Sequence, residues 1–389
     1  MKTLRLYYDD AYCASFEGRV VLSEDKKVAL DQSAFYPTSG GQPNDLGTLH
    51  FGDAAACVLD VTVEEDIVWH HLDRPIPQGT RVHGEIDWPR RFDHMQQHAG
   101  DHMIAGAIWQ LFRGVTIGLH TGQEESSIDI AMPDGKTHLT DEETAQVEKL
   151  VNERIQHNDP IRCWFPAEEE LSSLPIRKKP TVNEHIRIVA MGDYEMVACG
   201  GTHPTTTGQI GSVKILSTAP SRGNMRLTFI AGMRAIQHYQ ASHKCVREIS
   251  AQLSADVHTA PAALEKMLQA NAAQLKDVQS RLAQSTLHAV RMAGRSCGDL
   301  RVYPCHLPFA DAASMQQAAK AMLAEEKTIV LLSCQRENGR MLLFARSADL
   351  PHDMAALLRN AGARGGGKPG FAQGSTTGEN VLENALSLL

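Results

Sequence analysis

Two short patterns, about a hundred residues apart, most constrain what this chain can fold into. His98 and His102 stand four residues apart in a stretch with helical periodicity, so both imidazoles project from one helix face. Cys199 and His203 bracket a glycine-bearing turn between strand-like runs, Cys199-Gly200-Gly201-Thr202-His203. Three imidazoles and a thiolate are donors that zinc prefers, so a fold that brings the pairs together would hold one Zn²⁺ ion. On spacing alone, the alternative is a buried, hydrogen-bonded His98 and a structural Cys199.

Composition limits the classes of protein to consider. The chain has 389 residues, 42% hydrophobic and 22% charged, which suits an ordinary globular protein of two or three domains. A formal net charge of −8 argues against a general nucleic-acid binder, so any RNA contact must come from a local basic surface. No apolar run reaches the length of a membrane span and no signal-peptide core is visible, so we expect a cytoplasmic protein. The eight scattered cysteines are expected to be reduced, with one recruited to metal.

Hydrophobic patterning predicts four segments and an α+β fold. Residues 1–90 carry several short β-prone runs, which favour a small β-barrel or a sandwich. Residues 91–231 mix two amphipathic helices with strands and form the candidate zinc-binding domain. Residues 232–295 are rich in Ala, Gln and Leu with one break at Thr259-Ala260-Pro261, which predicts a helical hairpin linker. Residues 296–389 alternate strand and helix, the pattern of a small α/β domain.

Two helices of the second segment have definite signals. Apolar residues recur every three to four positions from Arg90 to Phe112, which predicts an amphipathic helix carrying both candidate histidines. Thr140-Asp141-Glu142-Glu143 is a capping box that opens the other helix. The first helix therefore offers a rigid support for half of the metal site.

Four motifs follow one another along nearly the whole chain. They are the stretches Phe35–Asp45, Arg91–His102, Cys199–His203 and Arg364–Pro369, the last with Ala372-Gln373-Gly374. The first three resemble the editing domain of alanyl-tRNA synthetase and its free-standing AlaX relatives. The fourth resembles the DHHA1 module that these synthetases share with DHH phosphoesterases. In the synthetase, the aminoacylation domain would have to precede residue 1 of this chain. The resemblance therefore implies a long AlaX protein, an editing protein without that domain.

This resemblance implies an activity and a cofactor. The expected reaction is hydrolysis of mischarged tRNA(Ala), chiefly Ser-tRNA(Ala) and secondarily Gly-tRNA(Ala). His98, His102, Cys199 and His203 would hold one zinc ion, with His203 as the exchangeable ligand. The chain departs from the usual family residues at Asp101, beside His102, and at Gln209, and neither change removes a ligand.

Other residues receive roles on the same basis. Thr38 is the candidate reader of the serine hydroxyl, the alternative being a turn hydroxyl that bonds nearby backbone. Gly40 and Gly41 would allow close approach to substrate, and Gln42 would donate to its carbonyl or ribose. His120 is expected to face the pocket from the strand after the first helix.

The C-terminal glycine run is the candidate tRNA contact. It differs from a P-loop in spacing, and a flexible surface loop is the alternative. The expected tRNA-binding residues are Arg364, Gly365, Gly366, Gly367 and Lys368. The 232–295 helices or the C-terminal domain would also support a homodimer, the alternative for the helices being packing within their own hairpin.

Three other functions compete with this interpretation. An editing domain of the threonyl-tRNA type would use a similar histidine and cysteine site, but the Gly200-Gly201-Thr202 interior favours the alanine system. A non-catalytic tRNA-binding factor would use zinc only for its structure. A DHH phosphoesterase would need carboxylate-rich metal motifs that this sequence lacks.

Overall fold

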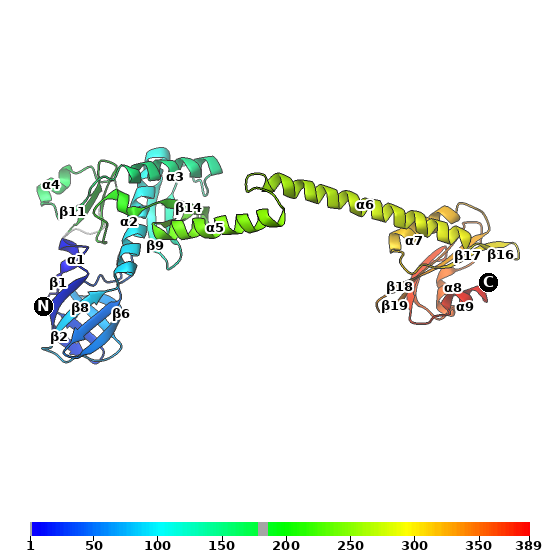
Figure 1. The fold of residues 1–389 in the computed structure, drawn as a ribbon, viewed down its shortest axis with the longest axis horizontal. Helices are drawn as coiled ribbons and strands as arrows, with labels where there is room; N and C mark the ends of the chain where they lie inside the picture. Colours follow the sequence, from blue (N-terminus) through cyan, green and yellow to red (C-terminus); the bar gives the residue numbers. More distant parts are fainter. Residues whose placement is uncertain (1, 178–185) are drawn as a thin grey trace. The chain divides into compact units, whose positions relative to one another are not determined.

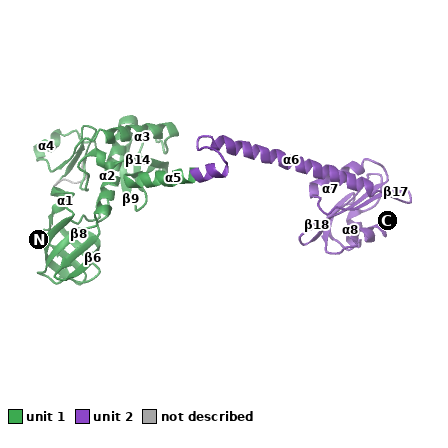
Figure 2. Cartoon of the chain, viewed as in Figure 1, with its two compact units in different colours: residues 1–246 green, residues 247–389 purple. Residues whose placement is uncertain are grey.

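The computed structural model describes residues 2–177 and 186–389. The chain divides into two compact units, Met1–Val246 and Arg247–Leu389 (Figure 2). Among the helices of the described residues, none combines the length and the apolarity needed to cross a membrane.

A closed six-stranded barrel opens the first unit, confirming the barrel predicted for residues 1–90 (Figure 1). Around the barrel the strands follow the order β2-β3-β7-β6-β5-β8. Their bounds are β2 (Ser15–Glu24), β3 (Lys27–Leu30), β5 (Gly47–Phe51), β6 (Ala54–Glu64), β7 (Ile67–Leu72) and β8 (Arg81–Ile86). Beside the barrel, β1 (Leu4–Arg5) pairs with β4 (Gln32–Ser33), and α1 (Leu6–Asp9) follows β1. Strands β5 and β8 complete the barrel between β6 and β2.

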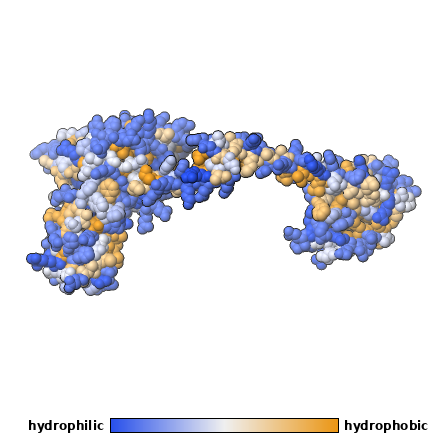
Figure 3. All heavy atoms as spheres, in the orientation of Figure 1, coloured by the Kyte–Doolittle hydropathy of each residue, from blue (hydrophilic) through white to orange (hydrophobic). Residues whose placement is uncertain are grey.

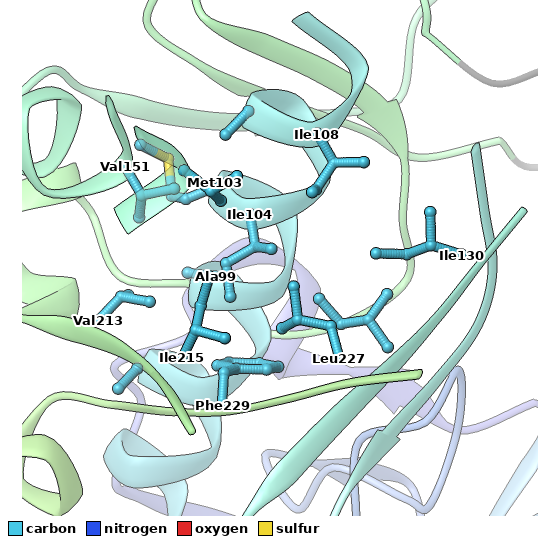
Figure 4. Packing of buried hydrophobic residues seen from close by; sticks show 14 of the residues in the cluster. Ala99, Met103, Ile104, Ile108, Ile130, Val151, Val213, Ile215, Leu227 and Phe229 are labelled. Atoms are coloured by element: carbon cyan, nitrogen blue, oxygen red, sulfur yellow. The ribbon is translucent and has the colours of Figure 1, made fainter. Parts of the chain in front are cut away.

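Helix α2 (Trp88–Phe112) is the central helix of the first unit. Asp87 caps its start by accepting a hydrogen bond from the backbone N–H of Arg90 at 3.2 Å. The helix ends at Arg113, which adopts a left-handed conformation with φ 59°. One face of α2 packs into the apolar core that Figure 4 shows, where Ala99, Met103, Ile104 and Ile108 meet Val151, Val213, Ile215, Leu227 and Phe229. The predicted helix is confirmed and begins two residues earlier than expected.

Two sheets surround this helix. The larger has the strand order β14-β15-β10-β9 and the smaller β11-β12-β13. Helix α3 (Asp141–Gln156) opens with the predicted capping box at Thr140. The remaining bounds are β9 (Val115–Thr121), β10 (Ser126–Ala131), β11 (Ile161–Trp164), α4 (Glu168–Ser173), β12 (Ile188–Met191), β13 (Glu195–Ala198), η1 (Thr207–Ile210), β14 (Val213–Ser221) and β15 (Asn224–Ala231).

The second unit contains a six-stranded sheet of order β16-β17-β18-β19-β21-β20, covered by helices. The segment after residue 295 thus contains both strands and helices, while its domain bounds and its DHHA1 character stay predictions. The strands are β16 (Arg295–Cys297), β17 (Leu300–His306), β18 (Thr328–Arg336), β19 (Gly339–Arg346), β20 (Arg364–Lys368) and β21 (Phe371–Thr376). The helices after the first strands are α7 (Ala312–Met322), α8 (Met354–Asn360) and α9 (Val381–Leu386).

The segment 232–295 forms two helices, as predicted, but they do not constitute a separate domain. Helix α5 (Met233–Gln252) begins in the first unit, where Arg234 pairs with Asp93 of α2. Helix α6 (Ala260–Met292) ends in the second unit, where Val290 is buried in the core. The packing of these helices into a hairpin stays a prediction.

The glycine run at 364–368 is a strand and not the loop that the sequence suggested. It forms β20 and pairs antiparallel with β21, with Arg364 opposite Ser375 and Lys368 opposite Phe371. A Cβ on Gly365 would lie 2.3 Å from the carbonyl oxygen of Gln373, so glycine is needed for this close pairing. The glycines therefore permit a tight strand pair at the edge of the sheet.

Candidate metal centre

The four predicted ligands meet in the first unit. His98 and His102 lie on one face of α2, and Cys199 and His203 lie in the turn that follows β13. Their ligand atoms all lie within 4.8 Å of one another. Nε2 of His98 is 3.2 Å from Sγ of Cys199, close to the roughly 3.5 Å that separates donors around tetrahedral zinc.

Buried, unpartnered nitrogen atoms make this cluster fit a cation. In the described part of the chain, Nε2 of His102 and both ring nitrogens of His203 are buried without a hydrogen-bond partner. Each such orphan costs roughly 1–3 kcal/mol unless something binds it. A set of three nitrogens and one sulfur is the donor chemistry of zinc, and these four residues would hold the ion.

Burial fixes the protonation state of the cluster. It lowers the pKa of His98 to about 4 and holds those of His102 and His203 well below the usual value, with neighbouring positive groups acting in the same direction. The imidazoles are therefore neutral and can act as ligands. Burial also raises the pKa of the Cys199 thiol to about 12, so a bound cation is needed to favour the thiolate.

Gln42 orients one ligand from the barrel side of the site. It is fully buried, its Oε1 accepts from Nδ1 of His98 at 2.9 Å and from the Thr202 backbone N–H at 3.1 Å, and its Nε2 donates to Thr202 Oγ1. Because Oε1 can only accept, Nδ1 of His98 carries the proton and Nε2 is left for the metal. Gln42 therefore positions a ligand, and its contact with the substrate stays a prediction.

The cysteine turn is shaped by a glycine and clamped by an arginine. A Cβ on Gly201 would lie 2.2 Å from Cε1 of His98, so no larger residue fits there. Nη1 of Arg187 donates to the carbonyl oxygens of Gly201 at 2.7 Å and Cys199 at 3.3 Å. Arg187 had no role in the sequence prediction, because nothing near it in the chain indicates that it reaches this turn.

A buried ion pair anchors the barrel to the metal-bearing helix. Nε of Arg91 lies 2.9 Å from Oδ1 of Asp45, and both side chains are fully buried. Nη2 of Arg91 also donates to the carbonyl of Ala34 and Nη1 to that of Ala11. Both charged residues belong to the recognised motifs, but only the fold reveals that they pair. Removing one partner would leave an uncompensated buried charge.

A cavity of about 1030 Å³ opens beside the cluster. His98, His102 and Cys199 line it together with side chains from the N-terminal segment and the smaller sheet. Its charged lining includes Lys2, Arg5, Asp9, Asp66, Asp101, Arg177 and Arg187, and its aromatic lining consists of Tyr8, Tyr36 and Phe165. The volume suits an aminoacyl group or a nucleotide.

The other predicted substrate residues divide between the cavity and its surroundings. Gly40 lines the cavity, whereas Gly41 turns towards β9, where its carbonyl accepts from the Thr121 N–H at 3.1 Å. Thr38 bonds Asn44 through its hydroxyl, as the turn alternative predicted, and Ser39 is the hydroxyl-bearing residue of this segment that lines the cavity.

His120 lies on β9 but is exposed and does not line the cavity, so its predicted position in the pocket is wrong. The cavity is lined instead by the four residues that precede it on β9, Thr116 to Leu119.

Two families match parts of the first unit. Residues 186–227, which contain the cysteine turn, match the family described as "Threonyl and Alanyl tRNA synthetase second additional domain". Residues 10–90, which form the barrel, match the family "tRNA synthetases class II (A)".

Curated relatives match over almost the full chain. An alanine–tRNA ligase of Ignicoccus hospitalis is 30% identical over 400 residues, covering 100% of this chain and 43% of the relative. That of Pyrobaculum aerophilum is 31% identical over 394 residues, covering 97% and 43%. The C-Ala domain of Aquifex aeolicus alanyl-tRNA synthetase covers 24% of this chain and 92% of its own at 16% identity, with a TM-score of 0.23 that is too low to support a structural argument. The chain spans less than half the length of these curated ligases. On these matches, which cover nearly the whole of this chain, the chain is an AlaX-like protein related to the editing domain of alanyl-tRNA synthetase.

Proposed function

We propose that this protein hydrolyses the ester bond of mischarged tRNA(Ala), chiefly Ser-tRNA(Ala) and secondarily Gly-tRNA(Ala). The observation that carries the proposal is the four-donor cluster of His98, His102, Cys199 and His203, of which the first three line a 1030 Å³ cavity. The match of residues 186–227 to the second additional domain of threonyl- and alanyl-tRNA synthetases supports it.

The reaction requires water to attack the carbonyl carbon while the bond from that carbon to the ribose oxygen breaks. The proton lost by the water ends on the ribose hydroxyl, and the amino acid leaves. When bound, zinc supplies electrostatic stabilisation of developing negative charge and fixes groups beside it. Gln42 holds His98 in one tautomer, and Arg187 holds the turn that carries Cys199. These contacts preorganise the site before substrate arrives.

His203 differs from His98 in how it is held. Both of its ring nitrogens lack a hydrogen-bond partner among the described residues, whereas His98 is fixed by Gln42. A ligand without an orienting hydrogen bond is the easier one to displace. We therefore assign His203 as the exchangeable ligand of the centre.

Selectivity requires a polar group that bonds the serine hydroxyl, because alanine would leave that group unpaired. We assign this role to the Thr38–Ser39 segment, with Ser39 as the reader and Thr38 as the turn residue that supports it. Ser39 lines the cavity, while the Thr38 hydroxyl is occupied by Asn44. Ser39→Ala should lower the ratio of Ser-tRNA(Ala) to Ala-tRNA(Ala) hydrolysis, and Thr38→Val should change it much less.

Hydrolysis of a panel of four substrates tests the proposed function. Zinc-loaded protein is incubated with Ser-tRNA(Ala), Gly-tRNA(Ala), Ala-tRNA(Ala) and Ser-tRNA(Thr), and amino-acid release is measured. We expect fast release from the first, slower release from the second and little from the others. Release from Ser-tRNA(Thr) instead would favour threonyl-type editing, and binding without release from any substrate would favour a non-catalytic tRNA-binding factor.

A further inference from the structure

The cavity carries an aromatic and cationic wall that the hydrolysis itself does not use. We propose that Phe165 and Arg5 form a subsite for the 3′-terminal nucleotide of a single-stranded RNA end, with the base on Phe165 and the phosphate at Arg5. The inference rests on the proposed function, since it names how the same cavity holds the nucleotide that carries the ester.

Phe165 is an exposed aromatic ring at the cavity. It follows β11, lines the cavity and is 47% exposed, although it is a large apolar side chain. Tyr8 supports it from the cavity side in an edge-to-face contact, with ring centroids 5.6 Å apart. A fixed and solvent-accessible ring is the usual platform for an unpaired base, because every base has a π-face.

Cations surround the supporting ring. Cζ of Arg187 lies 5.4 Å and Cζ of Arg5 lies 5.9 Å from the ring centroid of Tyr8. These contacts connect the aromatic wall to the cysteine turn, because Arg187 also holds the carbonyl oxygens of Cys199 and Gly201. The platform and the metal cluster are thus parts of one connected wall.

The arginine donors of this wall are incompletely satisfied. Among the described residues, Nε of Arg5, Nη1 of Arg177 and Nε of Arg187 are buried without a hydrogen-bond partner. All three arginines line the cavity. Guanidinium donors that lack acceptors beside an open cavity suit an anionic ligand, and small rotations of these side chains would present them to it.

The acidic groups nearby are compatible with a phosphate at this position. Asp66 accepts from Arg5 at 2.9 Å and lies 3.4 Å from Lys2, but its side chain is 56% exposed. An exposed ion pair contributes little, so a phosphate can replace this carboxylate as the partner of both cations. Glu168, Glu169 and Glu170 begin α4 close in sequence, but they do not line the cavity.

A binding cycle with uncharged tRNA tests the subsite without any hydrolysis. The Kd of wild-type and Phe165→Ala protein is measured for tRNA(Ala) with and without its terminal adenosine. In the wild type, loss of the adenosine should weaken binding by roughly 5- to 100-fold, the range expected for one stacked base. In Phe165→Ala the same loss should have little effect, and Phe165→Trp should restore it. Leu59→Ala, which changes a 59%-exposed residue on β6 outside the cavity lining, serves as the matched control.

Arg5→Gln provides a second reading of the same subsite. It should reduce the slope of log Kd against log salt concentration by about one, the contribution of one phosphate contact. With tRNA that lacks the terminal nucleotide, Arg5→Gln and wild type should have the same slope. Equal effects of adenosine removal on the wild type and on Phe165→Ala would overturn the inference. A cycle that behaves as expected in a protein that releases no amino acid would uphold the subsite and refute the proposed function.

Discussion

At the residue scale, the site consists of ligands that the sequence indicated and of supports that it did not. The four candidate ligands follow from their donor types together with the family resemblance of their motifs, because spacing alone leaves a hydrogen-bonded His98 and a structural Cys199 as an alternative. The role of Gln42 could not be predicted, because it depends on a contact across 56 residues between the barrel and α2. The same holds for Arg187, whose hydrogen bonds run to a turn that the sequence alone does not place beside it.

Metal content tests the ligand set directly. We expect about one zinc per wild-type chain and a large loss in Cys199→Ala, because three imidazoles would remain in a buried site built for four donors. Cys163→Ala is the matched control, since Cys163 packs against the same core but is not a member of the cluster. Elemental analysis of the purified proteins that gave equal zinc in Cys199→Ala and wild type would remove Cys199 from the ligand set.

The positioning role of Gln42 predicts a weaker metal site when its side chain is replaced. Gln42→Leu should lower zinc affinity by roughly 10- to 100-fold, the usual effect of losing a hydrogen bond to a ligating histidine. The measurement is competition for zinc with a chelator of known affinity. Gln209→Leu is the matched control, because Gln209 bonds Tyr12 and Thr205 and not the ligands. Unaltered zinc affinity in Gln42→Leu would show that His98 is oriented by other contacts.

At the element scale, helices with periodic apolar faces and explicit caps were predicted well, and strands rich in glycine were not. Helix α3 begins at its capping box because Thr140 and Glu143 satisfy each other's backbone N–H groups. The sequence predicts a loop at β20 because three adjacent glycines have low strand propensity, and the partner that stabilises them lies beyond a turn. The local sequence of a helix contains its cap and its apolar periodicity. The local sequence of β20 does not indicate the strand with which it pairs.

The strand geometry changes what is expected of the predicted tRNA contact. Arg364 and Lys368 stand at opposite ends of β20, roughly 13 Å apart at about 3.3 Å per residue, so they would reach different phosphates. Arg364→Ala and Lys368→Ala should each reduce the salt slope of tRNA binding by about one, and the effects should add. Lys320→Ala on α7 is the control. Salt slopes equal to wild type in the double variant would exclude β20 as the RNA contact.

At the scale of the whole molecule, α6 presents an apolar stripe with nothing packed on it in the described structure of its unit. Leu264, Leu268, Leu275 and Val278 are 40–60% exposed, and their spacing follows a heptad seam. Figure 3 shows apolar atoms along this helix. A stripe of this kind is expected to be covered, either by a second copy of the chain or by α5.

The oligomeric state of the protein distinguishes a second copy of the chain from α5 as the partner that packs on the stripe. If a second copy covers the stripe, wild-type protein has twice the 42.6 kDa chain mass, and Leu268→Lys with Leu275→Lys shifts it to the monomer. Ala273→Lys with Ser280→Lys adds the same charge to the other face of α6 and should leave the dimer intact. Light scattering on size-separated samples gives the masses. A monomeric wild type would contradict the dimer and leave the hairpin as the cover.

We propose that the metal cluster removes serine from tRNA(Ala) and spares alanine. The measurement is the single-turnover rate constant for amino-acid release from Ser-tRNA(Ala) and Ala-tRNA(Ala) by wild-type protein containing one zinc per chain. Cys199→Ala and Cys163→Ala are assayed beside it. We expect fast serine release by wild type and Cys163→Ala, slow alanine release by both, and serine release near the uncatalysed rate by Cys199→Ala. Equal rates for the two substrates, or serine release that persists in Cys199→Ala, would contradict it.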